Sequence, residues 1–319
     1  MVAAPGGDLL KRILVRLAQL AATILVTWFV STRAGLHLAE LAELDLADWS
    51  PRWGVLALSC AILLGGYFGT GLLWGWITAG LGGPTLPPGV SIRLFMIANL
   101  GRYLPGKVWQ IAGLVALARQ YGVPAGTATA AAIVAQGVSL ASATLIGLGA
   151  VWTLADGAPW RWAVPVALFG GVGLGLVPTV FDLLANAWFR LARAPRPEGL
   201  APRHGIGWLA GGLAGWLVYA AAFWVLVAGL GFDVPFLATA SAFAAAYVLG
   251  YLMIFAPAGI GVREGFLIAL LSPQLGAVSA GAIAVIARLW TTLVEVVPAA
   301  TFWARHLAST GRAGEARDG

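Results

Sequence analysis

The chain has 319 residues, of which 60% are hydrophobic and 10% are charged, and its formal net charge is +6. Folding leaves a large outer shell facing the solvent, so this composition excludes an ordinary soluble protein and indicates one embedded in lipid. In a membrane protein the positive charge sets the orientation and attracts anionic headgroups, so we expect the membrane, and not nucleic acid, as partner.

Two apolar segments early in the chain are each long enough to cross a bilayer as a helix. The first runs from Ile13 to Ser31, and we expect it to remain as an uncleaved anchor because no convincing small-residue cleavage site follows it. The second runs from Trp53 to Ala79. Its glycines would let neighbouring helices approach closely, and they stand at Gly65, Gly69, Gly71 and Gly75.

Residues 90–120 form a segment of a different kind. Only about fifteen membrane-compatible residues run from Val90 to Leu104, which is too few for an ordinary crossing. The break Pro105-Gly106-Lys107 follows, and a second short apolar run ends at Ala118. The pattern of helix, break and helix predicts a re-entrant hairpin with its tip at the turn after Leu104.

Three full spans are predicted next, at Ala125–Leu154, Trp162–Phe181 and Ile206–Leu230. The first of them is rich in small residues, which favours packing against other helices. Between the second and the third, Phe181–Arg193 is expected to form a short amphipathic helix on the membrane surface.

A second broken segment is predicted over residues 236–273. Phe236–Ala256 is apolar and stops at Pro257-Ala-Gly259-Ile-Gly261-Val-Arg-Glu-Gly265, after which a short apolar run ends at Ser272-Pro273. The last span is predicted from Val278 to Trp303. Residues 306–319 are polar, and we expect them to form a disordered cytoplasmic tail.

The fold predicted from these segments is an all-α integral membrane protein, a single domain over residues 1–305 with about six full transmembrane helices and two re-entrant hairpins. A shift of 152 residues places Pro105 on Pro257 and Gly113 on Gly265. Three spans separate the hairpins, so the repeats would be inverted, as in transporters whose broken helices meet at the midplane. With a cytoplasmic amino terminus, the cytoplasmic segments hold twelve basic residues and the outer loops hold three. This asymmetry predicts cytoplasmic termini in a bacterial inner membrane.

Six charged side chains fall at or near membrane depth, namely Arg102, Lys107, Arg263, Glu264, Arg288 and Glu295. Each would cost at least about 2.5–3.5 kcal/mol at the centre of an apolar helix, so they must pair or line a wet cavity. Cations outnumber acids and arginine matches phosphate oxygens, which favours a site for a phosphate-bearing lipid headgroup near Arg102–Gln110 and Pro257–Gly265. The alternative is structural ion pairing of Arg288 with Glu295, and of Glu264 with Arg102 or Arg263.

No group of residues suggests a metal, a cofactor or catalysis. The three histidines stand far apart without metal-ligand spacing, and Cys60 is expected to be a small buried hydrophobe. Gly106-Lys107 lacks the spacing of a phosphate-binding loop, and Gly259–Gly265 does not fit the dinucleotide fingerprint. We therefore expect no metal, no cofactor and no catalytic residue.

Two stretches carry a family resemblance: Asn99-Leu-Gly-Arg-Tyr-Leu-Pro-Gly-Lys-Val-Trp-Gln110 and Pro257-Ala-Gly-Ile-Gly-Val-Arg-Glu-Gly265. Together, in this order, they resemble the lysylphosphatidylglycerol synthase transmembrane-domain family, also described as flippase-like, over roughly residues 10 to 305. The resemblance marks as motif positions Arg102, Pro105, Gly106, Lys107, Gln110, Gly259, Gly261, Arg263 and Glu264, and Arg288 falls in a span where the family often has a charge.

The resemblance implies lipid handling. Some members carry a soluble aminoacyl-transferring domain, whereas others stand alone and are linked to glycolipid or polyprenyl-linked sugar pathways. We expect a stand-alone member without the synthase domain, which is not an enzyme but a flippase or flippase-like transporter of an anionic phospholipid or polyprenyl-phosphate-linked lipid. The alternatives are an intramembrane enzyme or enzyme subunit with Glu264 as candidate base, and a scaffold for a glycosyltransferase or lipid-synthase partner.

Overall fold

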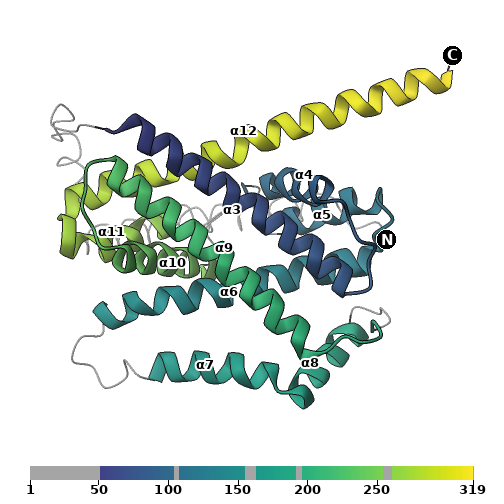
Figure 1. Ribbon diagram of the computed structural model, residues 1–319, viewed down its shortest axis with the longest axis horizontal. Helices are drawn as coiled ribbons and strands as arrows, with labels where there is room; N and C mark the ends of the chain where they lie inside the picture. The colour runs from purple at the N-terminus through teal and green to yellow at the C-terminus, as the bar shows by residue number, and fades with distance from the viewer. Residues whose placement is uncertain (1–50, 104–107, 155–162, 192–195, 254–260, 319) are drawn as a thin grey trace, which may run out of the picture.

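The computed structural model describes residues 51–103, 108–154, 163–191, 196–253 and 261–318, and the regular structure in these ranges is entirely helical (Figure 1). The elements are α3 (Trp53–Gly80), α4 (Pro88–Asn99), the 3₁₀ helix η2 (Leu100–Tyr103), α5 (Trp109–Arg119), α6 (Ala125–Leu154), α7 (Ala163–Leu176), α8 (Pro178–Leu191), α9 (Pro202–Gly229), α10 (Phe236–Leu252), α11 (Val262–Leu275) and α12 (Ala277–Asp318). The predicted first span, Ile13–Ser31, lies outside the described residues.

Four of these helices are long and apolar enough to cross a membrane. They are α3, α9, the part of α6 from Ala125 to Ala150 and the part of α12 from Ala277 to Ala304. The four spans predicted in these regions are thus confirmed as helices. Helix α9 starts four residues before the predicted Ile206, because Pro202 occupies its first turn, where a missing N–H group costs nothing.

The outward faces of the long helices are apolar, as a lipid environment requires. On α12, Val285, Leu289, Leu293 and Val297 recur every four residues and are each more than half exposed. The opposite face of the same helix buries Ile283, Ala287 and Trp290 in the core. An apolar stripe that faces away from the packed interior meets acyl chains in a membrane, whereas in water it would be a liability.

Glycines set the distance between α3 and its neighbours. Helix α3 packs most extensively on α9, where the Trp76 ring lies over Gly207 and Leu73 lies over Gly211. On another face, a Cβ atom at Gly71 would lie 2.9 Å from the Cα atom of Ile92 in α4. These contacts agree with the predicted role of small residues in close helix packing. Gly65 and Gly69, by contrast, have no described atom over them within 4 Å.

The predicted helix–break–helix pattern of the first hairpin is confirmed in the described residues. Helix α4 and the 3₁₀ turn η2 lead to residue 103, and α5 resumes at Trp109 and packs back against α4. The predicted break residues Pro105, Gly106 and Lys107 lie outside the described residues. The re-entrant course of this hairpin through the membrane stays a prediction.

The predicted span Trp162–Phe181 is not one continuous helix. Helix α7 ends at Leu176, the chain bends at Val177, and α8 begins at Pro178. Proline has no N–H group and a fixed φ, so it starts a new helix more readily than it continues the old one. The 14 residues of α7 rise only about 21 Å, short of a hydrocarbon core of roughly 30 Å. Helix α8 is the amphipathic helix predicted to follow.

The second hairpin differs from its predicted outline in two ways. Helix α11 begins at Val262, so Arg263 and Glu264 belong to its first turn and not to the break. It also continues through Ser272 and Pro273 to Leu275 and ends at Gly276, whose φ of 76° favours glycine. One proline in the last turn removes a single hydrogen bond, which does not stop a helix that is about to end. Pro257 and Gly259 lie outside the described residues.

The chain after the last span also differs from expectation. The sequence predicts a disordered tail over residues 306–319, but the α12 backbone stays helical to Asp318 and projects away from the bundle (Figure 1). Extending a helix that is already formed costs far less than nucleating one, and this segment contains several good helix formers. The side chains beyond Ala304 are not described.

Candidate functional site

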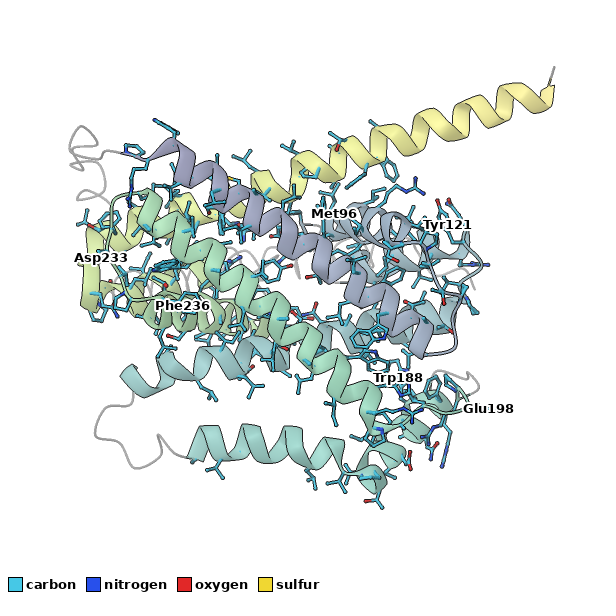
Figure 2. All side chains as sticks on the ribbon, viewed as in Figure 1. Met96, Tyr121, Trp188, Glu198, Asp233 and Phe236 are labelled. Carbon is cyan, nitrogen blue, oxygen red and sulfur yellow. The ribbon has the colours of Figure 1, made fainter. Side chains whose placement is uncertain are left out.

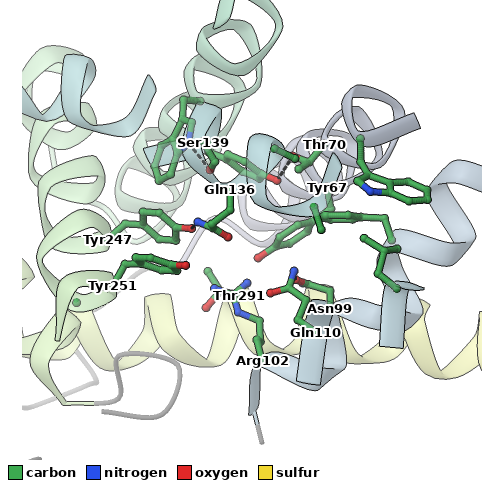
Figure 3. Close-up of a pocket in the computed structure, with 18 of the residues that line it drawn as sticks. Tyr67, Thr70, Asn99, Arg102, Gln110, Gln136, Ser139, Tyr247, Tyr251 and Thr291 are labelled. Carbon is green, nitrogen blue, oxygen red and sulfur yellow. Dashed lines mark hydrogen bonds between the residues drawn. The ribbon is translucent and has the colours of Figure 1, made fainter. Parts of the chain in front are cut away.

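A polar cavity of about 160 Å³ lies where the two hairpins approach each other inside the bundle (Figure 3). This volume has room for several water molecules or a small polar group. Eight of the described helices and the turn η2 contribute to its wall, α12 among them with Thr291. The polar lining consists of the hydroxyls of Tyr67, Thr70, Ser139, Tyr219, Tyr247, Tyr251 and Thr291, the amides of Asn99, Gln110 and Gln136, and the guanidinium groups of Arg102 and Arg263.

The polar ends of these side chains face a common space. In Figure 3, Tyr67, Gln136, Tyr247 and Tyr251 point into it from one side, while Asn99, Gln110 and Arg102 reach it from the other. Gln136 donates to the Tyr247 hydroxyl at 3.3 Å. The wall thus combines these polar groups with apolar side chains such as Leu63 and Phe95.

Arg102 is held by a buried carboxylate. Its Nη1 atom donates to Oε1 of Glu295 at 2.6 Å, and Glu295 is only 3% exposed. The hydroxyls of Tyr67 and Tyr103 also donate to this carboxylate. A buried ion pair is tolerated when its remaining hydrogen-bonding capacity is satisfied, and three donors supply that here. Arg102 therefore reaches the cavity with its charge already balanced.

Glu264 and Arg288 form a second, looser pair beside the cavity. The nearest atoms, Arg288 Nη1 and Glu264 Oε1, are 3.6 Å apart. Oε2 of Glu264 accepts from the backbone N–H of Gly261 at 2.6 Å, which caps the start of α11. Gly261 has a φ of 82°, a conformation that glycine adopts without strain.

The predicted ion-pair partners are therefore wrong. Arg288 pairs with Glu264 and not with Glu295, and Glu264 pairs with neither Arg102 nor Arg263. Seven residues place Arg288 and Glu295 on one face of α12, but they also separate them by about 10 Å along the axis. Each residue instead reaches the hairpin beside it, so α12 is tied to both hairpins by charge.

Arg263 differs from the other arginines at the site. Its guanidinium carbon lies 4.8 Å from the centroid of the Phe243 ring, and the side chain lines the cavity. Within the described parts of the chain, no carboxylate lies within ion-pair distance of it. Of the predicted site residues, the structure thus brings Arg102, Gln110 and Arg263 to the cavity wall, and it places Glu264, Arg288 and Glu295 around them as ion-pair partners.

Two buried donors in the cavity wall have no acceptor among the described residues. They are Nδ2 of Asn99, a residue 4% exposed, and Nε1 of Trp74, which is fully buried. Asn99 is positioned by Gln110, whose Nε2 atom donates to its Oδ1 at 2.9 Å. Buried donors are nearly always satisfied, so these two mark a place where a ligand oxygen or a water belongs.

The aromatic lining was not predicted, although the sequence contains a signal for it. Tyrosines in membrane helices gather at the two interfaces, where the hydroxyl meets water. Tyr67, Tyr219 and Tyr247 instead stand well inside apolar segments, where a hydroxyl needs a polar neighbour. Their positions indicate a polar interior, but without the fold the sequence could not show that they share one cavity.

In the described ranges, no group of three or more His, Cys, Asp or Glu side chains is arranged to hold a metal ion.

The family model described as "Lysylphosphatidylglycerol synthase TM region" matches residues 15–299, which includes both hairpins and the whole cavity wall. No curated protein and no solved structure matches the chain.

Proposed function

This chain belongs to the lysylphosphatidylglycerol synthase transmembrane-region family, and from that premise we propose that it is a flippase-like transporter, which moves an anionic lipid headgroup between the leaflets of the bacterial inner membrane. The observation that carries the proposal is the cavity that described residues of both hairpins line with polar groups, inside a bundle with apolar outer faces.

The two hairpins come from opposite ends of the bundle. Arg93, in the middle of α4, donates to the hydroxyl of Tyr121, just after α5, so this contact holds α4 beside the end where α5 finishes. Figure 2 places Tyr121 at that end and places Phe236, where α10 begins, at the other. Such an arrangement supports opposed re-entrant hairpins, the pattern that transporters use to build a midplane site.

Both hairpins present a helix start to the cavity. Gln110 stands in the first turn of α5 and Arg263 in the first turn of α11, and both line the cavity. The first N–H groups of a helix lack intrahelical partners and carry a partial positive charge. At α11 the carboxylate of Glu264 already accepts from the Gly261 N–H group, so the start of α5 and the cation of Arg263 are the features that favour an anion such as a phosphodiester.

In the proposed mechanism, helix α12 links the two hairpins during alternating access. It holds the first hairpin through Glu295 and Arg102 and the second through Arg288 and Glu264. In the proposed cycle, rocking of one hairpin against the other opens the cavity to one leaflet and then to the other, while the acyl or prenyl chains remain in lipid.

The basic residues support cytoplasmic termini. The end of the bundle that holds Tyr121 and Glu198 also carries arginines that are close to these two residues in the chain or in space, which are Arg93, Arg119, Arg190, Arg196 and Arg203. Arg52, which bonds to the last residues of α9, is at the end that holds Asp233. This asymmetry favours the first end as cytoplasmic.

The test is lipid exchange between leaflets in reconstituted liposomes that carry fluorescent phosphatidylglycerol. We expect the wild type to make inner-leaflet label accessible to a membrane-impermeant quencher. We expect Arg263→Gln to lose most of this activity, and the control Arg93→Gln, outside the cavity, to retain it. Folded wild-type protein that exchanges neither phosphatidylglycerol nor a polyprenyl-phosphate sugar would contradict transport and favour a scaffold or an enzyme subunit.

A further inference from the structure

The cavity wall is unbalanced in charge and in hydrogen-bonding capacity. From this we propose that the protein selects its lipid at the headgroup: it binds an anionic phosphodiester that carries hydroxyls, and it excludes headgroups that carry an ammonium group. This inference deepens the proposed function and rests on it for the role of the bound lipid as a transported substrate. The binding preference itself can be measured separately.

The charge of the wall is positive. Two arginines and no Asp or Glu are among the described residues that line the cavity. Glu295, outside the lining, neutralises Arg102 at 2.6 Å, whereas Arg263 has no carboxylate partner in the described ranges. A phosphate oxygen would supply the missing counter-charge, while an ammonium group would meet a second cation without a carboxylate to offset it.

An aromatic cage could in principle hold an ammonium group through cation–π contacts. Here the rings are otherwise engaged. The guanidinium of Arg263 already lies over Phe243 at 4.8 Å. Trp216 packs edge to face with Tyr219 at 5.6 Å and with Tyr247 at 4.7 Å, measured between ring centroids. The cation that lies over the Phe243 ring belongs to the protein itself.

The hydrogen-bonding groups point to a ligand rich in oxygen. Asn99 Nδ2 and Trp74 Nε1 can only donate, and both are buried in the wall without an acceptor among the described residues. Satisfying a buried donor is favourable because leaving it bare costs its full desolvation. Oxygens of a phosphodiester or a hydroxyl would satisfy them, whereas an ammonium group would bring more donors.

Hydroxyls on the headgroup are favoured by the opposite wall. Gln136, Tyr247 and Tyr251 present groups that can both donate and accept, which matches the dual character of an alcohol. The same rings give apolar surface to the carbon atoms between hydroxyls. Glycerol and larger polyols attached through a phosphate combine these features.

The experiment compares four lipids by native mass spectrometry of the detergent-solubilised full chain. Phosphatidylglycerol and phosphatidylinositol carry one negative charge and several hydroxyls. Lysylphosphatidylglycerol keeps the glycerophosphate but adds ammonium groups, and phosphatidylcholine is zwitterionic without hydroxyls. We expect the first two to bind at least about tenfold more tightly than the others, which corresponds to about 1.4 kcal/mol. Equal binding of all four lipids would overturn the inference.

Two variants test whether the preference comes from this wall. Asn99→Leu, close in size to the wild type, should reduce the preference for phosphatidylglycerol over phosphatidylcholine at least threefold. Asn186→Leu, whose wild-type side chain in α8 accepts from Arg196 and does not line the cavity, should leave the preference unchanged. An unchanged preference in folded Asn99→Leu would contradict the assignment to this cavity.

The leaflet-exchange assay separates this inference from the proposed function. Selective binding together with selective exchange supports both. Selective binding with no exchange of any lipid leaves the headgroup preference standing and removes transport. Exchange of all four lipids at one rate, with unselective binding, leaves transport standing and removes the headgroup preference.

Discussion

The two hairpins are built on one plan but hold their charges differently. The first brings Arg102 to the cavity with its charge balanced by Glu295, which two tyrosine hydroxyls also contact. The second brings Arg263 with no carboxylate partner in the described ranges, and its own acid, Glu264, turns to Arg288 on α12. The structure thus ties the first cation to a carboxylate of the protein itself, whereas the second is the one that our proposal assigns to a ligand.

The two hairpins also differ in the neutral side chains that they bring to the cavity. The first hairpin contributes the amides Asn99 and Gln110, which are hydrogen-bonded to each other at 2.9 Å. Its arginine is fixed, so it offers a rigid wall with directed donors. The second hairpin offers a cation beside a helix start. We therefore expect changes in the first hairpin to act mainly on stability, and changes in the second mainly on transport.

The largest expected effect comes from removing the buried carboxylate. Glu295→Leu leaves Arg102 without its counter-charge inside the bundle and removes an acceptor of the Tyr67 and Tyr103 hydroxyls, so we expect the free energy of unfolding to fall by about 3–5 kcal/mol. Denaturant titration in detergent micelles measures this loss. Adding Arg102→Met should restore a large part of it, because the uncompensated charge is removed as well. A single variant as stable as the wild type would show that the pair does not anchor the first hairpin.

A smaller loss of stability is expected where α4, in the first hairpin, packs against α3. Gly71→Ala would place a Cβ atom 2.9 Å from the Ile92 backbone, so α4 must shift, at a cost of about 1–3 kcal/mol. The control is Gly69→Ala, which meets no described atom within 4 Å and should be neutral or stabilising by up to about 1 kcal/mol. Thermal unfolding of the two variants in the same detergent compares them, and equal melting temperatures would contradict this packing.

The third prediction contrasts the two arginines in transport. Arg263→Gln should slow phosphatidylglycerol exchange at least about tenfold, about 1.4 kcal/mol, because it removes the cation of the wall that has no carboxylate within ion-pair distance among the described residues. The double variant Arg102→Met/Glu295→Leu removes a balanced pair and should cost exchange less than Arg263→Gln does. Both are measured in the same liposomes at matched protein density. A larger loss in the double variant would reverse the roles assigned to the two hairpins.

Much of this fold could be predicted from the sequence, because length and hydropathy act locally along the chain. The bounds of α3, the break between α4 and α5, and the gathering of Arg102, Gln110 and Arg263 followed from apolar runs and from the cost of burying charge. The partners of the charges could not be predicted. Spacing on α12 places Arg288 and Glu295 on one face, but only the fold sets which hairpin lies beside each.

The smallest expected effect concerns the looser ion pair of the second hairpin. Glu264→Gln keeps an oxygen for the Gly261 N–H group and loses a carboxylate that lies 3.6 Å from Arg288. The remaining loss is that of a charge at a helix start, about 0.3–1 kcal/mol. The same denaturant titration measures it beside Glu295→Leu. If the two losses were equal, α12 would hold both hairpins with equal strength, and the ion pair of Glu264 and Arg288 would not be the weaker of the two.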